Sequence, residues 1–329
     1  MWHNFCLVLP LSFVLSYLLG KITIQILKRI KAGQVILGYV SEHKTKGGTP
    51  TCGGIFFVLS AVIIYLIFNG IESSVAIVSI AFIVGYMLVG FIDDVIKIKQ
   101  KRNLGLKAYQ KIIFQVSLAI IASFYCYFNG ITQLIIPFSS KSIDISWGVF
   151  LFIPIVFLAT TNCVNLTDGL DGLAGGVCVV YLSIFAIILQ LQKGLFAEAY
   201  IYSSEYNKMT SLSLCFVGSL LAFLLFNTNK AVVFMGDTGS MALGGLVACL
   251  GIFSRNSLII PILGITFVFS GISVILQVIF FKKTGKRVFL MAPFHHHLQE
   301  KGYSECKIAY FYKITTFFCG LFMITFYIW

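Results

Sequence analysis

Long apolar runs separated by short polar connections dominate the chain. A helix needs about 20 mostly apolar residues to cross the hydrocarbon core, and the sequence offers ten candidates, some of them short. The expected spans are 5–27, 53–71, 74–92, 110–129, 147–164, 173–190, 210–226, 239–254, 258–281 and 307–327. The pattern predicts an all-α integral membrane protein with about ten transmembrane helices.

Lysine and arginine collect in alternate connections, and this alternation predicts the orientation. The rich connections contain Lys28, Arg29, Lys31, Lys44 and Lys46, then Lys97 to Lys111, then Lys282 to Lys307. By the positive-inside rule these connections are cytoplasmic. The connections between them hold only Lys141, Lys193, Lys208 and Arg255. An even number of spans then places both termini on the periplasmic side.

Composition supports a single polytopic membrane domain over residues 1–329. The chain is 58% hydrophobic and 11% charged, with a mean hydropathy of +0.94, far from the composition of soluble domains. The net charge of +12 is typical of membrane topology, and we expect no nucleic-acid partner. The nine cysteines show no metal or disulfide spacing and are expected to be packing residues. The first apolar run lacks a signal-peptide pattern and is expected to stay as a helix.

Five of the twelve acidic residues fall at the expected cytoplasmic ends of spans. They are Asp93, Asp94, Asp168, Asp171 and Asp237. One carboxylate at a helix end can be a solvated terminus, but five on one face favour a site. The adjacent Asp93 and Asp94 repel each other, which indicates a bound cation or a raised pKa suited to base chemistry.

Two motifs add oxygen ligands at this face. Asn165, Asp168 and Asp171 follow one another at three-residue steps, a spacing that can bring them to one face of a turn. Asp237, within Gly-Asp-Thr-Gly-Ser, can supply a carboxylate to Mg²⁺, which prefers hard oxygen ligands with phosphates and water. The residues after Asp237 can open a helix whose N-terminus would favour a phosphate.

Cations and histidines complete the candidate chemistry. Lys97, Lys101, Lys107 and Lys111 could line a helix that continues into the cytosol and bind phosphate, or could reflect topology alone. The three residues His295 to His297 could bind zinc, or could hydrogen-bond phosphate or sugar. No ATP-binding glycine loop is present. Together these features favour phosphoryl transfer to a lipid at the membrane surface.

The motifs together resemble the phospho-N-acetylmuramoyl-pentapeptide transferase family, a branch of the polyprenyl-phosphate N-acetylhexosamine-1-phosphate transferase superfamily. The resemblance covers nearly the whole chain and is carried by the segments 48–54, 91–94, 165–174, 226–227, 233–240 and 283–297. The Asp93–Asp94 pair and the Asp168 and Asp237 motifs resemble the whole superfamily. The last segment resembles the muramoyl-pentapeptide branch in particular and decides the donor.

The resemblance implies a Mg²⁺-dependent homodimer of ten-span subunits in the bacterial inner membrane. The reaction it implies joins UDP-MurNAc-pentapeptide and undecaprenyl phosphate to give lipid I and UMP, the first membrane step of peptidoglycan synthesis. One alternative is the transfer of GlcNAc-1-phosphate from UDP-GlcNAc to a polyprenyl phosphate. Another is a transporter or channel, although its polar groups would lie near the middle of the membrane.

The resemblance also assigns roles to individual residues. Asp93 resembles the base that deprotonates the lipid phosphate, Asp94 lies beside it, and Asp237 resembles the Mg²⁺ ligand. A covalent role for a carboxylate stays open as an alternative. The residues expected to bind substrate are Lys46, Thr51, Lys97, Lys111, Asn162, Asn165, Asp168, Asp171, Asn227, Phe234, His295, His296 and His297.

Five positions depart from the family's pattern. Cys52 stands where Met is usual, Cys163 where Ala is usual, and Leu225 where Trp often precedes Phe-Asn. All three are apolar, and we expect them to change only packing. Lys230 replaces a usual Pro, and Gln299 occupies a position that commonly holds Glu.

Overall fold

A computed structural model describes residues 2–30, 32–33, 48–102, 104–139, 141–195, 203–228 and 230–328. Its α-helices are α1 (Trp2–Arg29), α2 (Gly54–Asn69), α3 (Ser74–Gln100), α4 (Ala108–Phe128), α5 (Val149–Thr167), α6 (Leu173–Leu195), α8 (Ser203–Asn227), α9 (Gly236–Phe253), α10 (Ile260–Leu263), α11 (Ile265–Thr284), α12 (Phe294–Glu300) and α13 (Glu305–Ile328). Two 3₁₀ turns, η2 (Ser146–Gly148) and η3 (Ser257–Ile259), precede α5 and α10.

Among the described residues, nine helices are long and apolar enough to cross a membrane. They are α1, α3, α4, α5, α6, α8, α9, α11 and α13. This confirms a helical, multi-pass membrane protein. The remaining expected span, 53–71, corresponds to α2, an apolar helix of 16 residues that extends about 24 Å and is shorter than a typical hydrocarbon core.

Helix α3 runs well past its expected end at residue 92. Asp93 and Lys97 are one turn apart and form an ion pair in this extension, and the helix ends at Lys101, whose φ of 48° is left-handed. The hypothesis that four lysines follow along one continuing helix was therefore wrong. Lys97 lies on α3, whereas Lys107 and Lys111 belong to the start of α4.

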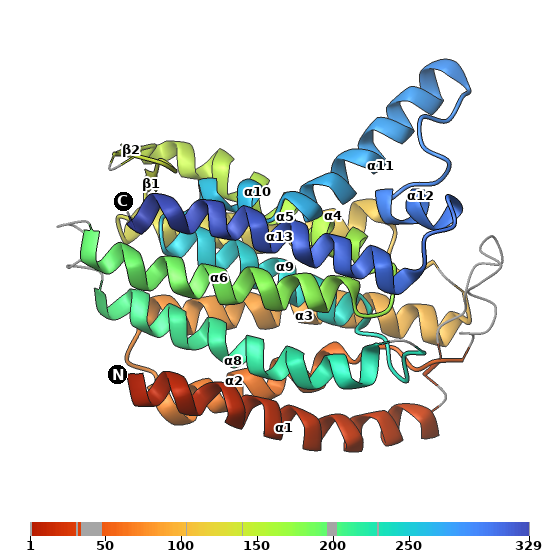
Figure 1. Cartoon of the computed structure of the whole chain (residues 1–329), viewed down its shortest axis with the longest axis horizontal. Helices are drawn as coiled ribbons and strands as arrows, with labels where there is room; N and C mark the ends of the chain where they lie inside the picture. Colours follow the sequence, from red (N-terminus) through yellow and green to blue (C-terminus); the bar gives the residue numbers. More distant parts are fainter. Residues whose placement is uncertain are drawn as a thin grey trace.

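The expected span 258–281 is broken near its beginning. Pro261 lies in the first turn of α10, and α10 stops at Gly264, whose N–H bonds Ile260 O at 2.8 Å. Helix α11 then departs from the bundle at an angle (Figure 1). The fold also differs from the all-α expectation between α4 and α5. A hairpin lies there, in which β1 (Gln133–Ile135) pairs antiparallel with β2 (Ser142–Asp144).

Helix α9 lies at the centre of the bundle, packed against α2, α3 and α5. All its residues from Thr238 to Phe253 are buried. Gly90 of α3 allows the closest approach, because a Cβ there would overlap the carbonyl group of Asp237. This contact brings the Asp93–Asp94 pair to the first turn of α9.

The outer helices carry large apolar side chains on their surfaces. Leu18 and Ile22 of α1 and Phe318 and Phe322 of α13 are each more than half exposed. Apolar side chains of this kind suit contact with lipid chains. The helices also satisfy their backbone hydrogen bonds internally, as a membrane requires. Both termini lie at one end of the bundle, and α12 lies at the other (Figure 1).

Candidate active site

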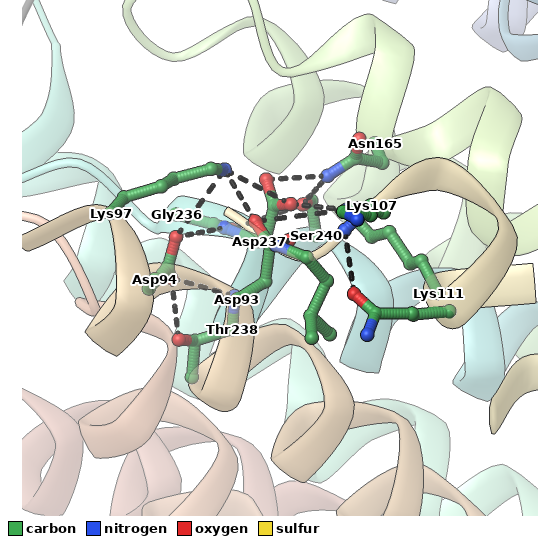
Figure 2. Close-up of polar contacts among 12 residues, drawn as sticks. Asp93, Asp94, Lys97, Lys107, Lys111, Asn165, Gly236, Asp237, Thr238 and Ser240 are labelled. Atoms are coloured by element: carbon green, nitrogen blue, oxygen red, sulfur yellow. Dashed lines mark hydrogen bonds and ion pairs between the residues drawn. The ribbon is translucent and has the colours of Figure 1, made fainter. Parts of the chain in front are cut away.

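Three carboxylates meet where α3 and α9 come together. Asp93, Asp94 and Asp237 each offer an oxygen, and these oxygens all lie within 4.8 Å of one another. Figure 2 shows Lys97, Lys111 and Asn165 pointing into the same cluster from α3, α4 and α5. The structure thus brings together six of the residues that the sequence singled out.

Asp94 caps the N-terminus of α9. Its Oδ2 accepts from Thr238 N at 2.9 Å and from Thr238 Oγ1 at 2.6 Å, and its Oδ1 accepts from Asp237 N at 3.2 Å. A carboxylate at this end of a helix is stabilised by the free N–H groups and by the helix dipole. The expectation that these N–H groups would hold a phosphate is therefore wrong, because Asp94 already occupies them.

Asp93 faces the two lysines beside this cap. Its Oδ2 lies 2.6 Å from Lys97 Nζ and 4.0 Å from Lys111 Nζ. Its Oδ1 accepts from Leu106 N at 2.8 Å, which ties the α3–α4 connection to the site. Successive helical residues are about 100° apart around the axis, so Asp93 bonds the α3–α4 connection and Asp94 bonds the first turn of α9, while Lys97 Nζ lies near both carboxylates, at 2.6 and 3.9 Å.

Asp237 receives both lysines. Lys97 Nζ lies 3.2 Å from its Oδ2, and Lys111 Nζ forms a close ion pair with the same oxygen. Its Oδ1 accepts from Asn165 Nδ2 at 3.0 Å, and the same amide donates to Ser240 Oγ at 2.8 Å. Asp237 lies in the first turn of α9, and side chains from α3, α4 and α5 hold its carboxylate in place.

Asp168 adds a further carboxylate at the end of α5. Burial and the charges of Asp237, Asp94 and Asp171 raise the pKa of Asp168 well above its ordinary value, because ionisation there adds charge to an already negative region.

The donor set suits a divalent cation. The three carboxylates Asp93, Asp94 and Asp237 lie around only two ammonium groups, those of Lys97 and Lys111. Negative charge is left over in this cluster, and a divalent cation would offset it. Hard carboxylate oxygens are also the ligands that Mg²⁺ prefers.

Two expected binding residues hold backbone segments beside the cluster. Asp171 Oδ2 accepts from Ala231 N at 3.1 Å. Asn227 is buried, accepts from Gly172 N at 3.0 Å and donates to Val233 O at 2.8 Å. Both side chains therefore join the α5–α6 turn to the segment that leads into α9.

Two other expected binding residues lie on the segments that frame the cluster. Phe234 pairs through its backbone with Pro50 O at 2.8 Å, and Thr51 is buried next to it. Asn162 lies apart, where its amide donates to Gln115 Oε1 at 3.0 Å and to Leu158 O at 2.8 Å. Lys46 lies outside the described residues.

The three histidines of α12 point in different directions. His295 is buried, and a Cβ on Gly169 would overlap its Nε2, so it packs against the turn between α5 and α6. His296 Nδ1 lies 2.7 Å from Gln299 Oε1, and His297 Nδ1 accepts from Leu290 N at 3.2 Å. Within the described part of the chain, the carboxylate cluster is the only group of three metal-ligating side chains.

Sequence reasoning missed the residues that position the carboxylates. Thr238 and Ser240 lie within the Gly-Asp-Thr-Gly-Ser motif, so this motif was the available signal, but only a helix start was read from it. Leu106 contributes a backbone N–H to Asp93, and a bond of this kind cannot be predicted from the pattern of side chains.

Comparisons with known proteins identify the family of the chain. Residues 75–255 match the model of glycosyl transferase family 4. The relative from Caldanaerobacter subterraneus subsp. tengcongensis, named phospho-N-acetylmuramoyl-pentapeptide-transferase, is 41% identical over 93% of both chains. Relatives of the same name from Bacillus subtilis (40% identical, 91% of this chain and 90% of the relative) and Desulfitobacterium hafniense (38%, 98% and 97%) are also similar. The chain therefore belongs to the phospho-N-acetylmuramoyl-pentapeptide-transferase family.

Proposed function

We propose that the protein transfers phospho-MurNAc-pentapeptide from UDP-MurNAc-pentapeptide to undecaprenyl phosphate, giving lipid I and UMP. Membership of the family supports the reaction. The observation that carries the proposal is the cluster in which Asp93, Asp94 and Asp237 meet between Lys97 and Lys111. Phosphoryl transfer depends mainly on positioning and charge stabilisation, and this cluster supplies groups for both.

Asp237 is the residue that would hold Mg²⁺ in this proposal. Bound there, the ion would neutralise charge on the donor's diphosphate. The Asp94 oxygens already accept three hydrogen bonds, so Asp94 fixes the α9 terminus that carries Asp237. Lys97 and Lys111 are close enough to these carboxylates to contact phosphate oxygens beside them.

In the proposed step, an oxygen of the lipid phosphate attacks the phosphorus that carries the sugar. The bond from this phosphorus to the UMP oxygen breaks, and UMP leaves with the bonding pair. Asp93 accepts the proton of the lipid phosphate when that phosphate is protonated. Asp93 suits this role better than Asp94, since Asp94 caps α9 and its oxygens face backbone donors.

An apolar groove along α5 gives the polyprenyl chain a place in this proposal. Its lining includes Val156, Cys163 and Val164 of α5, Pro261 of α10 and Val268 of α11. Val164 directly precedes Asn165, which bonds Asp237. A lipid chain in this groove would present its phosphate near the carboxylates.

The proposal places the protein in the bacterial inner membrane as a homodimer. The carboxylate cluster and the basic connections after α3 and α11 would face the cytoplasm, where the nucleotide substrate is found. Both termini, at the opposite end of the bundle, would face the periplasm. The exposed apolar side chains of α1 and α13 would contact membrane lipids or the second subunit.

The test uses the purified protein in detergent with undecaprenyl phosphate, UDP-MurNAc-pentapeptide and Mg²⁺. We expect mass spectrometry to find undecaprenyl diphosphate linked to MurNAc-pentapeptide. EDTA should abolish its formation, and added Mg²⁺ should restore it. Asp237→Asn serves as the matched negative control. Turnover that persists without any divalent cation would contradict the metal assignment, and no lipid-linked product from the folded protein would contradict the function.

A further inference from the structure

Helix α11 carries a narrow polar stripe on an otherwise apolar surface. Ser270, Ser273 and Gln277 follow at steps of three and four residues, which places them on one face. Gln277 is the only polar residue between Val274 and Phe281. An amide in such an apolar helix is unfavourable unless its donor and acceptor are both bonded.

The Gln277 amide uses both of its polar groups on one backbone segment. Its Oε1 accepts from Val288 N at 3.1 Å and from Phe289 N at 2.9 Å. Its Nε2 donates to Phe289 O at 3.2 Å. One side chain therefore folds the segment after α11 back onto the helix.

Ser273 holds the other end of the same segment. Its Oγ accepts from Phe294 N, the first residue of α12, at 3.0 Å. It also donates to Ser270 O at 2.8 Å, so the hydroxyl both donates and accepts. Two side chains one turn apart on α11 thus fix the beginning and the end of residues 288–294.

This segment is in direct contact with the histidine helix. Leu290 N donates to His297 Nδ1 at 3.2 Å, and the ring centroids of Phe289 and His297 are 5.6 Å apart. His295, on the next face of α12, packs on Gly169 so closely that a Cβ there would overlap the imidazole. Gly169 directly follows Asp168, whose pKa is raised by burial and by the charges of Asp237 and Asp94.

We propose that Gln277 is a positioning residue for the transfer reaction. It holds residues 288–290 against α11 and thereby fixes α12, so that His295 stays packed against the turn that carries Asp168. The effect on turnover rests on the proposed function. A displacement of about 1 Å at a reacting centre can lower the rate about 10²-fold, so a loose α12 should reduce catalysis without removing any group that touches substrate.

The first test compares Gln277→Leu with wild type and with a matched control. Gln190→Leu makes the same change on α6, where Gln190 donates to Thr210 Oγ1 at 2.6 Å. Gln190 lies near the end of α6 that is far from α12 (Figure 1). We expect Gln277→Leu to lower kcat about 10-fold to 100-fold and Gln190→Leu to change it less than about 2-fold. Gln277→Glu keeps the acceptor for both N–H groups and should recover part of the loss.

A double variant separates positioning from general damage. If Gln277 acts through α12, then adding Gln277→Leu to His295→Ala should lower kcat no further than His295→Ala alone. Losses that multiply would overturn the proposal, as would a Gln277→Leu enzyme with the kcat of the wild type. If Gln277→Leu does not fold, Ser273→Ala replaces it, since it removes the second anchor of the same segment.

Hydrogen exchange gives a readout that needs no turnover. In Gln277→Leu without substrate, we expect faster amide exchange over residues 288–300, including α12, and unchanged exchange there in Gln190→Leu. Faster exchange confined to Val288 and Phe289 would overturn the positioning role. If this difference in exchange is found but the wild-type protein makes no product, the proposed function is contradicted instead, so the two failures are distinguishable.

Discussion

The Asp94 carboxylate and Thr238 form the joint between α3 and α9: Asp94 Oδ2 accepts from both the backbone N and the side-chain Oγ1 of Thr238, at 2.9 and 2.6 Å. These residues are far apart in the chain and meet because α3 approaches α9 at Gly90. The joint sets the position of Asp237, which lies between the capped terminus and the two lysines.

Thr238→Val tests this joint with a change of similar shape. Valine lacks the hydroxyl donor, so the variant should lose about 1.5–3 kcal/mol of folding stability, the range for a hydrogen bond to a charged group. Because Asp237 would be held less firmly, kcat should fall about 10-fold or more. Thermal unfolding in detergent and steady-state assays measure both effects. Wild-type stability together with wild-type kcat would contradict the claim that the Asp94–Thr238 contact positions Asp237.

The two adjacent aspartates should respond differently to the same substitution. Asp93→Asn removes the proposed base and should lower kcat by about 10²–10⁴-fold, with little loss of stability, because it also relieves repulsion in the cluster. Asp94→Asn should lower both kcat and stability, since its amide places donors against the N–H groups of Asp237 and Thr238. Equal stability losses in the two variants would contradict the separate roles.

Asp168 should make the metal-free protein sensitive to pH. Its pKa is raised in the folded state, so its ionisation lowers stability, and this penalty is full above the folded pKa and absent below the unfolded pKa. With EDTA present, Asp168→Asn should therefore unfold a few degrees above wild type near pH 8. The difference should shrink as the pH falls, and saturating Mg²⁺ should reduce it. An Asp168→Asn protein that is less stable than wild type near pH 8 without metal would contradict this.

Asp237→Asn should affect the metal requirement most directly. The proposed carboxylate ligand is lost, so the Mg²⁺ concentration for half-maximal activity should rise at least about 10-fold. Residual turnover at high Mg²⁺ is measured as UMP release over a series of concentrations. An unchanged Mg²⁺ dependence would contradict the assignment of Asp237 as a ligand of the ion.

The membrane class and the approximate spans could be predicted from the sequence, because the length of each apolar run is a local property of the chain. The grouping of the carboxylates could be predicted as well, because they follow or precede spans on the side where lysine and arginine collect. It could not separate the roles of Asp93 and Asp94, since their partners are chosen by helical rotation and by the contact of α3 with α9. The break at Gly264 and the β1–β2 hairpin depend on packing and on backbone pairing. The burial of His295 against Gly169 likewise depends on a tertiary contact.

The central claim, transfer of a phospho-sugar pentapeptide to a polyprenyl phosphate, is tested most directly by UMP release from the purified protein. The assay contains Mg²⁺ and undecaprenyl phosphate and compares UDP-MurNAc-pentapeptide with UDP-GlcNAc as donor. The account predicts UMP release with the pentapeptide donor alone, and none when undecaprenyl phosphate is omitted. Release with UDP-GlcNAc and none with UDP-MurNAc-pentapeptide would contradict it.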